Sequence, residues 1–140
     1  MYKRQPTEDV IEHLQLEPGT PVVYIKRLFL FDDKPLAVGR SWLSLARFPG
    51  LDETGLGEKG LTATLRSRYN TIIRRFNDAI EAVRPAPDER NLLDVSYDCP
   101  LLMVRGLSFD QHNVPVEYST TYWLGDKVRF TVSMNTQELE

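Results

Sequence analysis

The sequence of 140 residues contains few of the residue types on which metal sites and covalent catalysis depend. Its one cysteine, Cys99, excludes an internal disulfide and a cysteine-rich zinc site, and no motif around it indicates a nucleophile. Its two histidines, His13 and His112, lie in a predicted helix and a predicted turn, without the spacing of metal ligands. We therefore expect no metal, no cofactor and no catalytic residue.

The sequence also lacks an excess of positive charge and lacks long apolar runs. The net charge of -3 at pH 7 argues against a nucleic-acid-binding surface on this chain. No apolar run approaches the roughly 18 residues that a membrane-spanning helix needs, and the first residues lack a signal-peptide pattern. With 41% hydrophobic residues, the chain 1–140 fits a single globular domain, which we expect in the cytoplasm without a membrane partner.

The stretch 116–134 has the pattern of two strands joined by a tight turn at Gly125 and Asp126. The predicted pairs are Trp123 with Val128, Thr121 with Phe130, Ser119 with Val132 and Glu117 with Met134. In this register Glu117 lies on the apolar face of the hairpin. Burial of a lone carboxylate costs several kcal/mol, so Glu117 must be paired, be protonated or face a polar cavity. Glu117 is therefore the first candidate site residue.

Residues 21–31 and 36–43 predict an earlier hairpin. If its loop has two or four residues, Arg27 and Arg40 lie on the same apolar face, close enough to converge. Two guanidinium groups repel each other unless an anion or an acid lies between them. The pattern favours an anion clamp, and an ion pair between Arg27 and Glu117 is the alternative. A three-residue loop would remove the argument for Arg40.

The remaining patterns complete the order helix, two strands, helix, strand, helix, three strands, which predicts an antiparallel α+β domain. They are a helix from Thr7, a loop over 44–59, a helix over 61–69, a strand over 71–84, a helix over 87–94 and a strand over 101–109. At the start of the middle helix, Gly60 and Thr62 offer free backbone N–H groups and a hydroxyl to an anion. Simple helix capping is the alternative for Thr62.

Three further side chains are candidate ligand contacts, and for each of them a structural role is the alternative. Arg105 lies among apolar neighbours, where it either contacts the ligand, snorkels to solvent or pairs with Glu117. Tyr122 and Trp123 either line a pocket or pack in the core, as strand aromatics usually do.

Several stretches of the chain resemble the UTRA domain, the effector-binding domain of GntR-type transcription regulators of the HutC branch. They are PVVYIKRLFLFDDKPLAVGRSWL, ARFPGL, AIEAVRP, LLMVRGLSF and VPVEYSTTYWLGDKVRFTV. The resemblance spans roughly residues 7–132, and its most specific part is the ending P-x-E-Y-x-x-x-Y-x-x-G-D-x-x-x-F. ARFPGL and EYS are most similar to the phosphonate-utilisation regulators of that branch.

This resemblance implies a six-stranded antiparallel sheet with flanking helices, in the chorismate-lyase-like fold. It also implies a small-molecule pocket, a homodimer, and a winged helix-turn-helix domain that precedes this one in the full regulator. That domain is absent from the sequence, so we expect contact with DNA only through it.

The resemblance also implies where a ligand binds. In members that bind phosphosugars, ligand contacts fall at positions that match Arg27, Gly60, Thr62 and Glu117. Two departures stand out, since phenylalanine at 29 and glycine at 39 replace an arginine and an acid that such members often have. The departures favour a smaller anion, such as a phosphonate, phosphate ester or carboxylate, with Arg40 as the second positive charge.

Two rival functions belong to other classes. An enzyme on the same fold, acting on a small carboxylate as chorismate lyase does, is the first, but the sequence shows no nucleophile with a base. A purely structural dimerisation domain without a ligand is the second.

Overall fold

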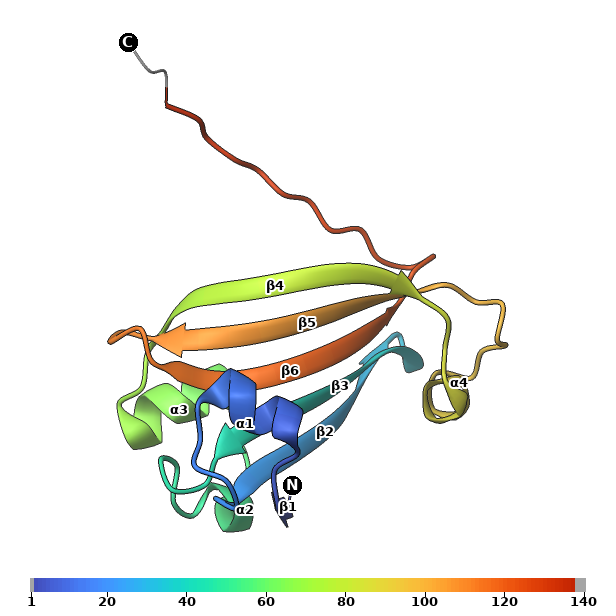
Figure 1. Cartoon of the computed structure of the whole chain (residues 1–140). Coiled ribbons are helices and arrows are strands. Elements are labelled where there is room, and N and C mark those ends of the chain that lie inside the picture. Colours follow the sequence, from blue (N-terminus) through green and yellow to red (C-terminus); the bar gives the residue numbers. More distant parts are fainter. Residues whose placement is uncertain (1, 138–140) are drawn as a thin grey trace.

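The computed structural model describes residues 2–137, which form one six-stranded sheet with four helices packed on it (Figure 1). The strands are β1 (Tyr2–Arg4), β2 (Val22–Phe31), β3 (Lys34–Ser44), β4 (Ile73–Val83), β5 (Leu101–Asp110) and β6 (Pro115–Leu124). Their order across the sheet is β1-β2-β3-β6-β5-β4, and every neighbouring pair is antiparallel. The helices are α1 (Glu8–Leu14), α2 (Leu51–Thr54), α3 (Leu61–Tyr69) and α4 (Pro87–Leu93). The predicted α+β architecture with a six-stranded antiparallel sheet is confirmed.

The helix starts follow local chemistry. Thr7 caps α1, since its hydroxyl oxygen accepts a hydrogen bond from the Val10 amide at 3.4 Å. α4 begins with Pro87, whose fixed backbone suits the first turn of a helix. The predicted helices over 61–69 and near 87–94 are confirmed, whereas the short α2 lies within the predicted loop over 44–59.

The predicted closing hairpin is wrong. β6 pairs with β3 on one side and β5 on the other, so no edge of β6 is left for residues 128–134. Residues 128–137 form no strand and project from the sheet (Figure 1). The sixth strand is instead β1, which precedes the first element that we predicted, the helix from Thr7.

Each face of the sheet carries its own helices. We call one the α3 face, because Val23, Ile25 and Leu43 pack there with Leu61 and Leu65 of α3. The other is the α1 face, which α1 and α4 cover. It contains two smaller clusters, built on Val10, Leu14, Val22 and Tyr118 and on Leu93, Leu101 and Leu124. Any side chain can therefore be assigned to one face by its register.

A β-bulge changes the predicted relation between Arg27 and Arg40. The turn is the two-residue one, since Phe31 pairs with Lys34, but the register shifts between Phe29 and Leu30. Beyond the shift Arg27 pairs with Gly39, and Arg40 pairs with Lys26. One extra residue in a strand reverses the face of every residue after it. Arg27 therefore lies on the α3 face, Arg40 lies on the α1 face, and the predicted convergence of the two is wrong.

Candidate functional site

A chain of polar contacts on the α3 face joins Arg27 to Glu117. A terminal nitrogen of Arg27 donates to the hydroxyl oxygen of Ser41 at 3.5 Å, and the Ser41 hydroxyl lies close enough to the Glu117 carboxylate to lower its pKa. Ser41 is almost fully buried, at 1% exposed. The Nε of Arg27 is also buried, and it has no hydrogen-bond partner among residues 2–137. A buried N–H donor without a partner is costly, so an acceptor placed beside this nitrogen would stabilise the folded state.

A second carboxylate, that of Asp78, approaches the same place from β4. In the register of the sheet Asp78 pairs with Gly106, and Gly106 pairs with Ser119. A Cβ placed on Gly106 would lie 2.4 Å from an oxygen of Asp78, so the carboxylate occupies the space that a side chain at 106 would fill. Asp78 makes no hydrogen bond or ion pair with the part of the chain that the structure describes. Its charge is therefore available to a ligand.

The two acids hold their protons more tightly than usual. Burial raises the pKa of Glu117, and the charge of Asp78 raises it further, while the Ser41 hydroxyl and the Arg27 charge act in the opposite direction. Burial also raises the pKa of Asp78. The Arg27 charge thus acts on Glu117, and Asp78 adds a second carboxyl group whose charge reaches Glu117 from the opposite, β4 side of the sheet. Such a site suits a molecule with an acceptor for Arg27 and with hydroxyl or ammonium donors for the acids.

Gly60 and Thr62 lie at the start of α3, the helix packed on this face. Gly60 precedes the first turn with a φ of 90°, a conformation that favours glycine, and no side chain caps the helix. Thr62 is exposed, while the hydroxyl of Thr64 donates to the Gly60 carbonyl at 2.7 Å. The capping alternative for Thr62 therefore does not hold, and the first N–H groups of α3 point out of the helix without a side-chain cap.

Trp123 also lies on the α3 face, where it stacks on the Phe29 ring with centroids 6.1 Å apart. The Arg27 guanidinium lies 5.3 Å from the Phe29 ring centroid. A Cβ on Gly39 would be 3.1 Å from the Phe29 ring, so this ring leans over the backbone of β3. The aromatic pair thus forms an apolar border beside Arg27.

The other three predicted site residues lie on the opposite face. Arg40 donates to Glu89 at 3.0 Å and also pairs with Asp88, both from α4, and Lys26 bonds Asp88 at 2.9 Å. The Glu89 side chain is only 6% exposed. Arg40 is therefore a structural partner of α4 and is not part of the site around Arg27.

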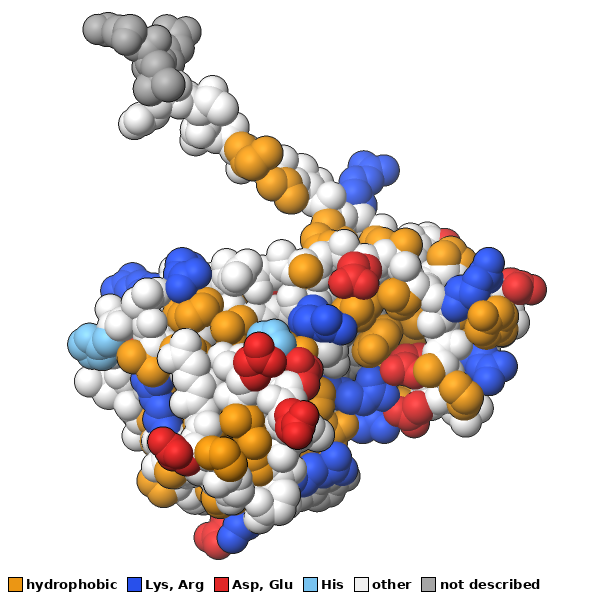
Figure 2. Space-filling view, in the orientation of Figure 1, with side chains coloured by type: hydrophobic (Ala, Val, Ile, Leu, Met, Phe, Trp, Pro, Cys, Tyr) orange, Lys and Arg blue, Asp and Glu red, His pale blue; other side chains and the backbone are white. Residues whose placement is uncertain are grey.

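Tyr122 lies close to this network, with the Arg40 guanidinium 5.6 Å from its ring centroid. Burial, together with the nearby charge of Glu89, raises the pKa of Tyr122. Figure 2 shows acidic, basic and hydrophobic side chains side by side between α1 and α4 on this face. Tyr122 packs on the α1 face, where it pairs with Val38, so it does not border the site around Arg27.

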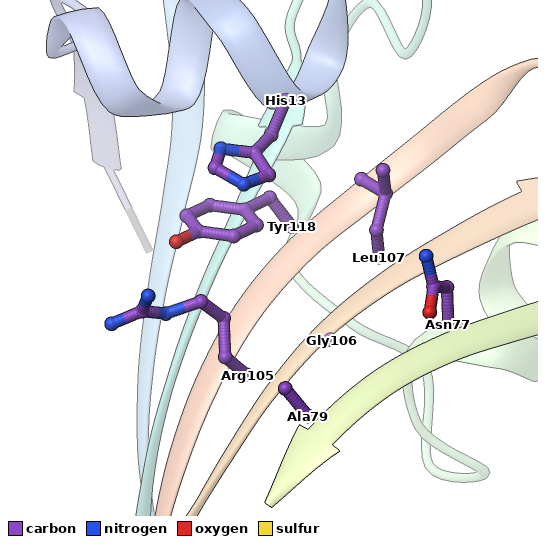
Figure 3. A pocket seen from close by; sticks show the side chains of 7 residues that line it. All are labelled: His13, Asn77, Ala79, Arg105, Gly106, Leu107 and Tyr118. Atoms are coloured by element: carbon purple, nitrogen blue, oxygen red, sulfur yellow. The ribbon is translucent and has the colours of Figure 1, made fainter.

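Arg105 lines a small hollow on the α1 face, of about 170 Å³. There the His13 ring stacks on Tyr118 with centroids 4.3 Å apart, and Arg105 extends alongside them (Figure 3). Arg105 and Glu117 lie on opposite faces, because Arg105 pairs with Thr120 and Glu117 pairs with Ser108. The alternative of an ion pair between them is wrong.

Sequence reasoning missed Ser41 and Asp78. The alternation that places Phe76, Ile80 and Ala82 on one face of the predicted strand also places Asp78 there. An acid in an apolar row was thus a detectable signal, of the kind that marked Glu117. Ser41 could not be found in this way. The prediction assumed a hairpin without a bulge, and this assumption places Ser41 on the face opposite to Arg27.

Other kinds of site find no support. Among residues 2–137, no group of three or more histidine, cysteine or acidic side chains is placed to hold a metal ion. No helix in the described part of the chain is long and apolar enough to cross a membrane. Cys99 is half-buried, and burial raises the pKa of its thiol, which disfavours the reactive thiolate.

The strand order and the flanking helices define the class of fold, an α+β domain built on one six-stranded antiparallel sheet. The sequence profile of the UTRA domain matches residues 1–129. The transcriptional repressor PhnF of Mycolicibacterium smegmatis is 30% identical over 124 residues, which cover 89% of this chain and 50% of that protein. A probable fructoselysine utilization operon repressor of Escherichia coli is 24% identical over 86% of this chain and 50% of its own length.

Solved structures agree. The effector domain of PhnF from Mycobacterium smegmatis has a TM-score of 0.88 and 28% identity, covering 96% of this chain and 82% of that one. The ligand-binding domain of a GntR-family regulator from Bordetella bronchiseptica has a TM-score of 0.90 and 25% identity, with coverage of 95% and 86%. The chain belongs to the UTRA domain family, the effector domains of GntR-family transcriptional regulators. It spans about half the length of the curated relatives it matches, and these are regulators, so the enzyme alternative is set aside.

Proposed function

We propose that this domain senses a small metabolite with an anionic group and transmits its binding through a homodimer to DNA-binding domains elsewhere in a regulator. The observation that carries the proposal is the buried Nε of Arg27, which has no partner among residues 2–137 and lies beside Ser41 and Glu117. A phosphonate, phosphate ester or carboxylate supplies the missing acceptor. The uncapped start of α3 at Gly60 and Thr62, on the same face, is suited to the same anion.

The two carboxyl groups refine the ligand class. With Arg27 alone the site would favour any anion, but Glu117 and Asp78 leave it with more acid than base. A simple anion would be repelled by these acids unless it also carried groups that donate to them. We therefore favour an anion with a hydroxyl or ammonium group a few atoms away.

Binding would act through the relative position of two domains. A ligand shifts an equilibrium only as far as it binds one state better than the other. If the bound state changes the geometry of the dimer, it changes the spacing of two DNA-binding heads and hence operator affinity. A regulator of this kind works in the cytoplasm, where its DNA and metabolites are.

The test is thermal melting of the domain with ethylphosphonate, aminoethylphosphonate, ethyl phosphate and propionate. A ligand present at about 100 times its dissociation constant stabilises the native state by roughly 2.7 kcal/mol, which raises the melting midpoint by several degrees. We expect the amino-substituted anion to give the larger shift of the two phosphonates. If no compound with an anionic group shifts the midpoint, the proposal fails and a purely structural dimerisation domain is favoured.

A further inference from the structure

A row of small polar residues crosses the α3 face from β3 to β4. Ser41 of β3 pairs with Ser119 of β6. Ser119 pairs with Gly106 of β5, which in turn pairs with Asp78 of β4. Residues that pair directly across strands point to the same face of a sheet, so these four lie side by side on the α3 face. The row therefore connects the hydroxyl group beside Arg27 to the carboxylate of Asp78.

The two ends of this row carry opposite charges. At the β3 end, a terminal nitrogen of Arg27 lies 3.5 Å from the Ser41 hydroxyl oxygen. At the other end, the Asp78 carboxylate lies over Gly106, in the space that a Cβ there would fill. The guanidinium is thus placed over β3 and the carboxylate over β5, with only β6 between them. Two inter-strand spacings put about 10 Å between the two charged groups.

The residues between the two ends are mostly small. The neighbouring row begins at Arg27 and continues with Gly39 of β3 and Thr121 of β6. In these two rows no charged side chain lies between Arg27 and Asp78. A ligand that spans the two charges would therefore meet backbone and hydroxyl groups, which tolerate polar atoms along its length.

Asp78 is better placed than Glu117 to bind a cation. The charge of Arg27 and the Ser41 hydroxyl already act on Glu117. Asp78, in contrast, makes no hydrogen bond or ion pair within residues 2–137. Burial raises the pKa of Asp78, so its charged form lacks the compensation that a cation would supply.

We propose that Asp78, held over Gly106, binds a cationic group of the effector, and that the distance from Asp78 to Arg27 selects the effector by its length. This inference rests on the effector function proposed above. It adds the orientation of the ligand, with its anionic group toward β2 and its cationic group toward β4. The ligand class is then an anion with an ammonium group at a defined distance.

The spacing sets a minimum length. Charged hydrogen bonds are about 2.8 Å long. One such bond at each end of a gap of about 10 Å leaves about 4 Å between the anionic oxygen and the ammonium nitrogen. Three bonds of an extended chain cover at most about 3.8 Å. An aminomethyl anion is therefore too short, whereas aminoethyl and aminopropyl anions reach both groups.

Calorimetric titration with aminomethyl-, 2-aminoethyl- and 3-aminopropylphosphonate tests the spacing. We expect the aminomethyl compound to bind at least about tenfold more weakly than the two longer ones, as for loss of one charged hydrogen bond. Ethylphosphonate, which has no cationic group, should bind as weakly as the aminomethyl compound. Equal affinity of all four compounds overturns the inference and leaves the effector proposal standing. If none of the four binds, the effector proposal fails and the inference with it.

Asp78→Asn tests the role of the carboxylate at nearly constant shape. The variant should bind 2-aminoethylphosphonate at least about tenfold more weakly and should bind ethylphosphonate no more weakly than the parent chain does. The matched control is Glu81→Gln, which removes the same charge from the α1 side of β4 and should leave both affinities unchanged. An equal loss for both ligands in Asp78→Asn would show that Asp78 does not bind the cationic group.

Gly106→Ala tests the position of the carboxylate without changing any charge. The added methyl group meets the Asp78 carboxylate, which must move away from the row. We expect the preference for 2-aminoethylphosphonate over ethylphosphonate to disappear. A preference as large as that of the parent chain would contradict the placement of Asp78 over Gly106. If the alanine variant does not fold, Asp78→Asn decides between the two outcomes.

Discussion

At the scale of single residues, the proposed ligand class rests on Glu117 and Asp78. Both lie on the α3 face with raised pKa values, and Arg27 is the cation whose charge acts on Glu117. A carboxyl group in such a place is either a partner for a ligand or a source of instability at neutral pH. Its effect on stability can be measured without any ligand.

Glu117→Gln should change how stability depends on pH. Because burial raises the folded-state pKa of Glu117, the folded state binds the proton more tightly than the unfolded state. The free energy of unfolding therefore falls as pH rises through the interval between the two pKa values, by about 1.4 kcal/mol for each tenfold difference in proton affinity. The variant lacks this loss, so it should melt higher than the parent chain at pH 7 and lose this advantage toward pH 4.

The control is Glu53→Gln, at an exposed position in α2, which should show no such crossover. Urea unfolding at several pH values measures both variants. A Glu117→Gln variant that is less stable than the parent chain at pH 7 would mean that the Arg27 and Ser41 contacts outweigh burial.

At the scale of secondary-structure elements, α4 is attached to the sheet through Arg40. The ion pair with Glu89 is largely removed from solvent, with the Arg40 side chain 15% and the Glu89 side chain 6% exposed. Loss of one member of such a pair leaves the other charge buried and uncompensated. The contact therefore matters more for α4 than an ion pair on the surface would.

Arg40→Ala should lower the free energy of unfolding by about 3 kcal/mol and should speed amide hydrogen exchange in α4 first. Combining Arg40→Met with Glu89→Leu should restore most of the loss, because no buried charge then remains. Arg84→Ala, which removes an exposed ion pair to Asp98, should cost less than about 0.5 kcal/mol. A loss no larger for Arg40→Ala than for Arg84→Ala would contradict the structural role given to Arg40.

The elements also show where the sequence was informative. The positions of α1 and α4 followed from capping and proline, and β2, β4, β5 and β6 followed from alternation and turn residues, because these signals are local. The bulge between Phe29 and Leu30 was not predictable from alternation, since both faces of β2 are largely apolar. That one extra residue moved Arg40 to the other face, and the predicted site lost Arg40 with it.

At the scale of the whole molecule, the misplaced hairpin has a physical cause. Residues 128–134 carry a strand pattern, but pattern does not name the partner strand. β3 and β5 occupy both sides of β6, and this long-range pairing is invisible to a local rule. The outcome is a single sheet with a candidate site on one face, two helices covering the other, and a segment over 128–137 that pairs with no strand among residues 2–137.

The central claim is that the effector binds on the α3 face at Arg27. Calorimetric titration of aminoethylphosphonate, or of whichever probe gives the larger melting shift, into the parent chain, Arg27→Ala and Arg105→Ala tests it most directly. Both variants remove one arginine, but Arg105 lies on the α1 face. We predict that Arg27→Ala weakens binding about 10- to 100-fold, as expected for loss of a charged hydrogen bond, with Arg105→Ala nearly unaffected. Unchanged affinity in Arg27→Ala, or an equal loss in Arg105→Ala, would contradict the account.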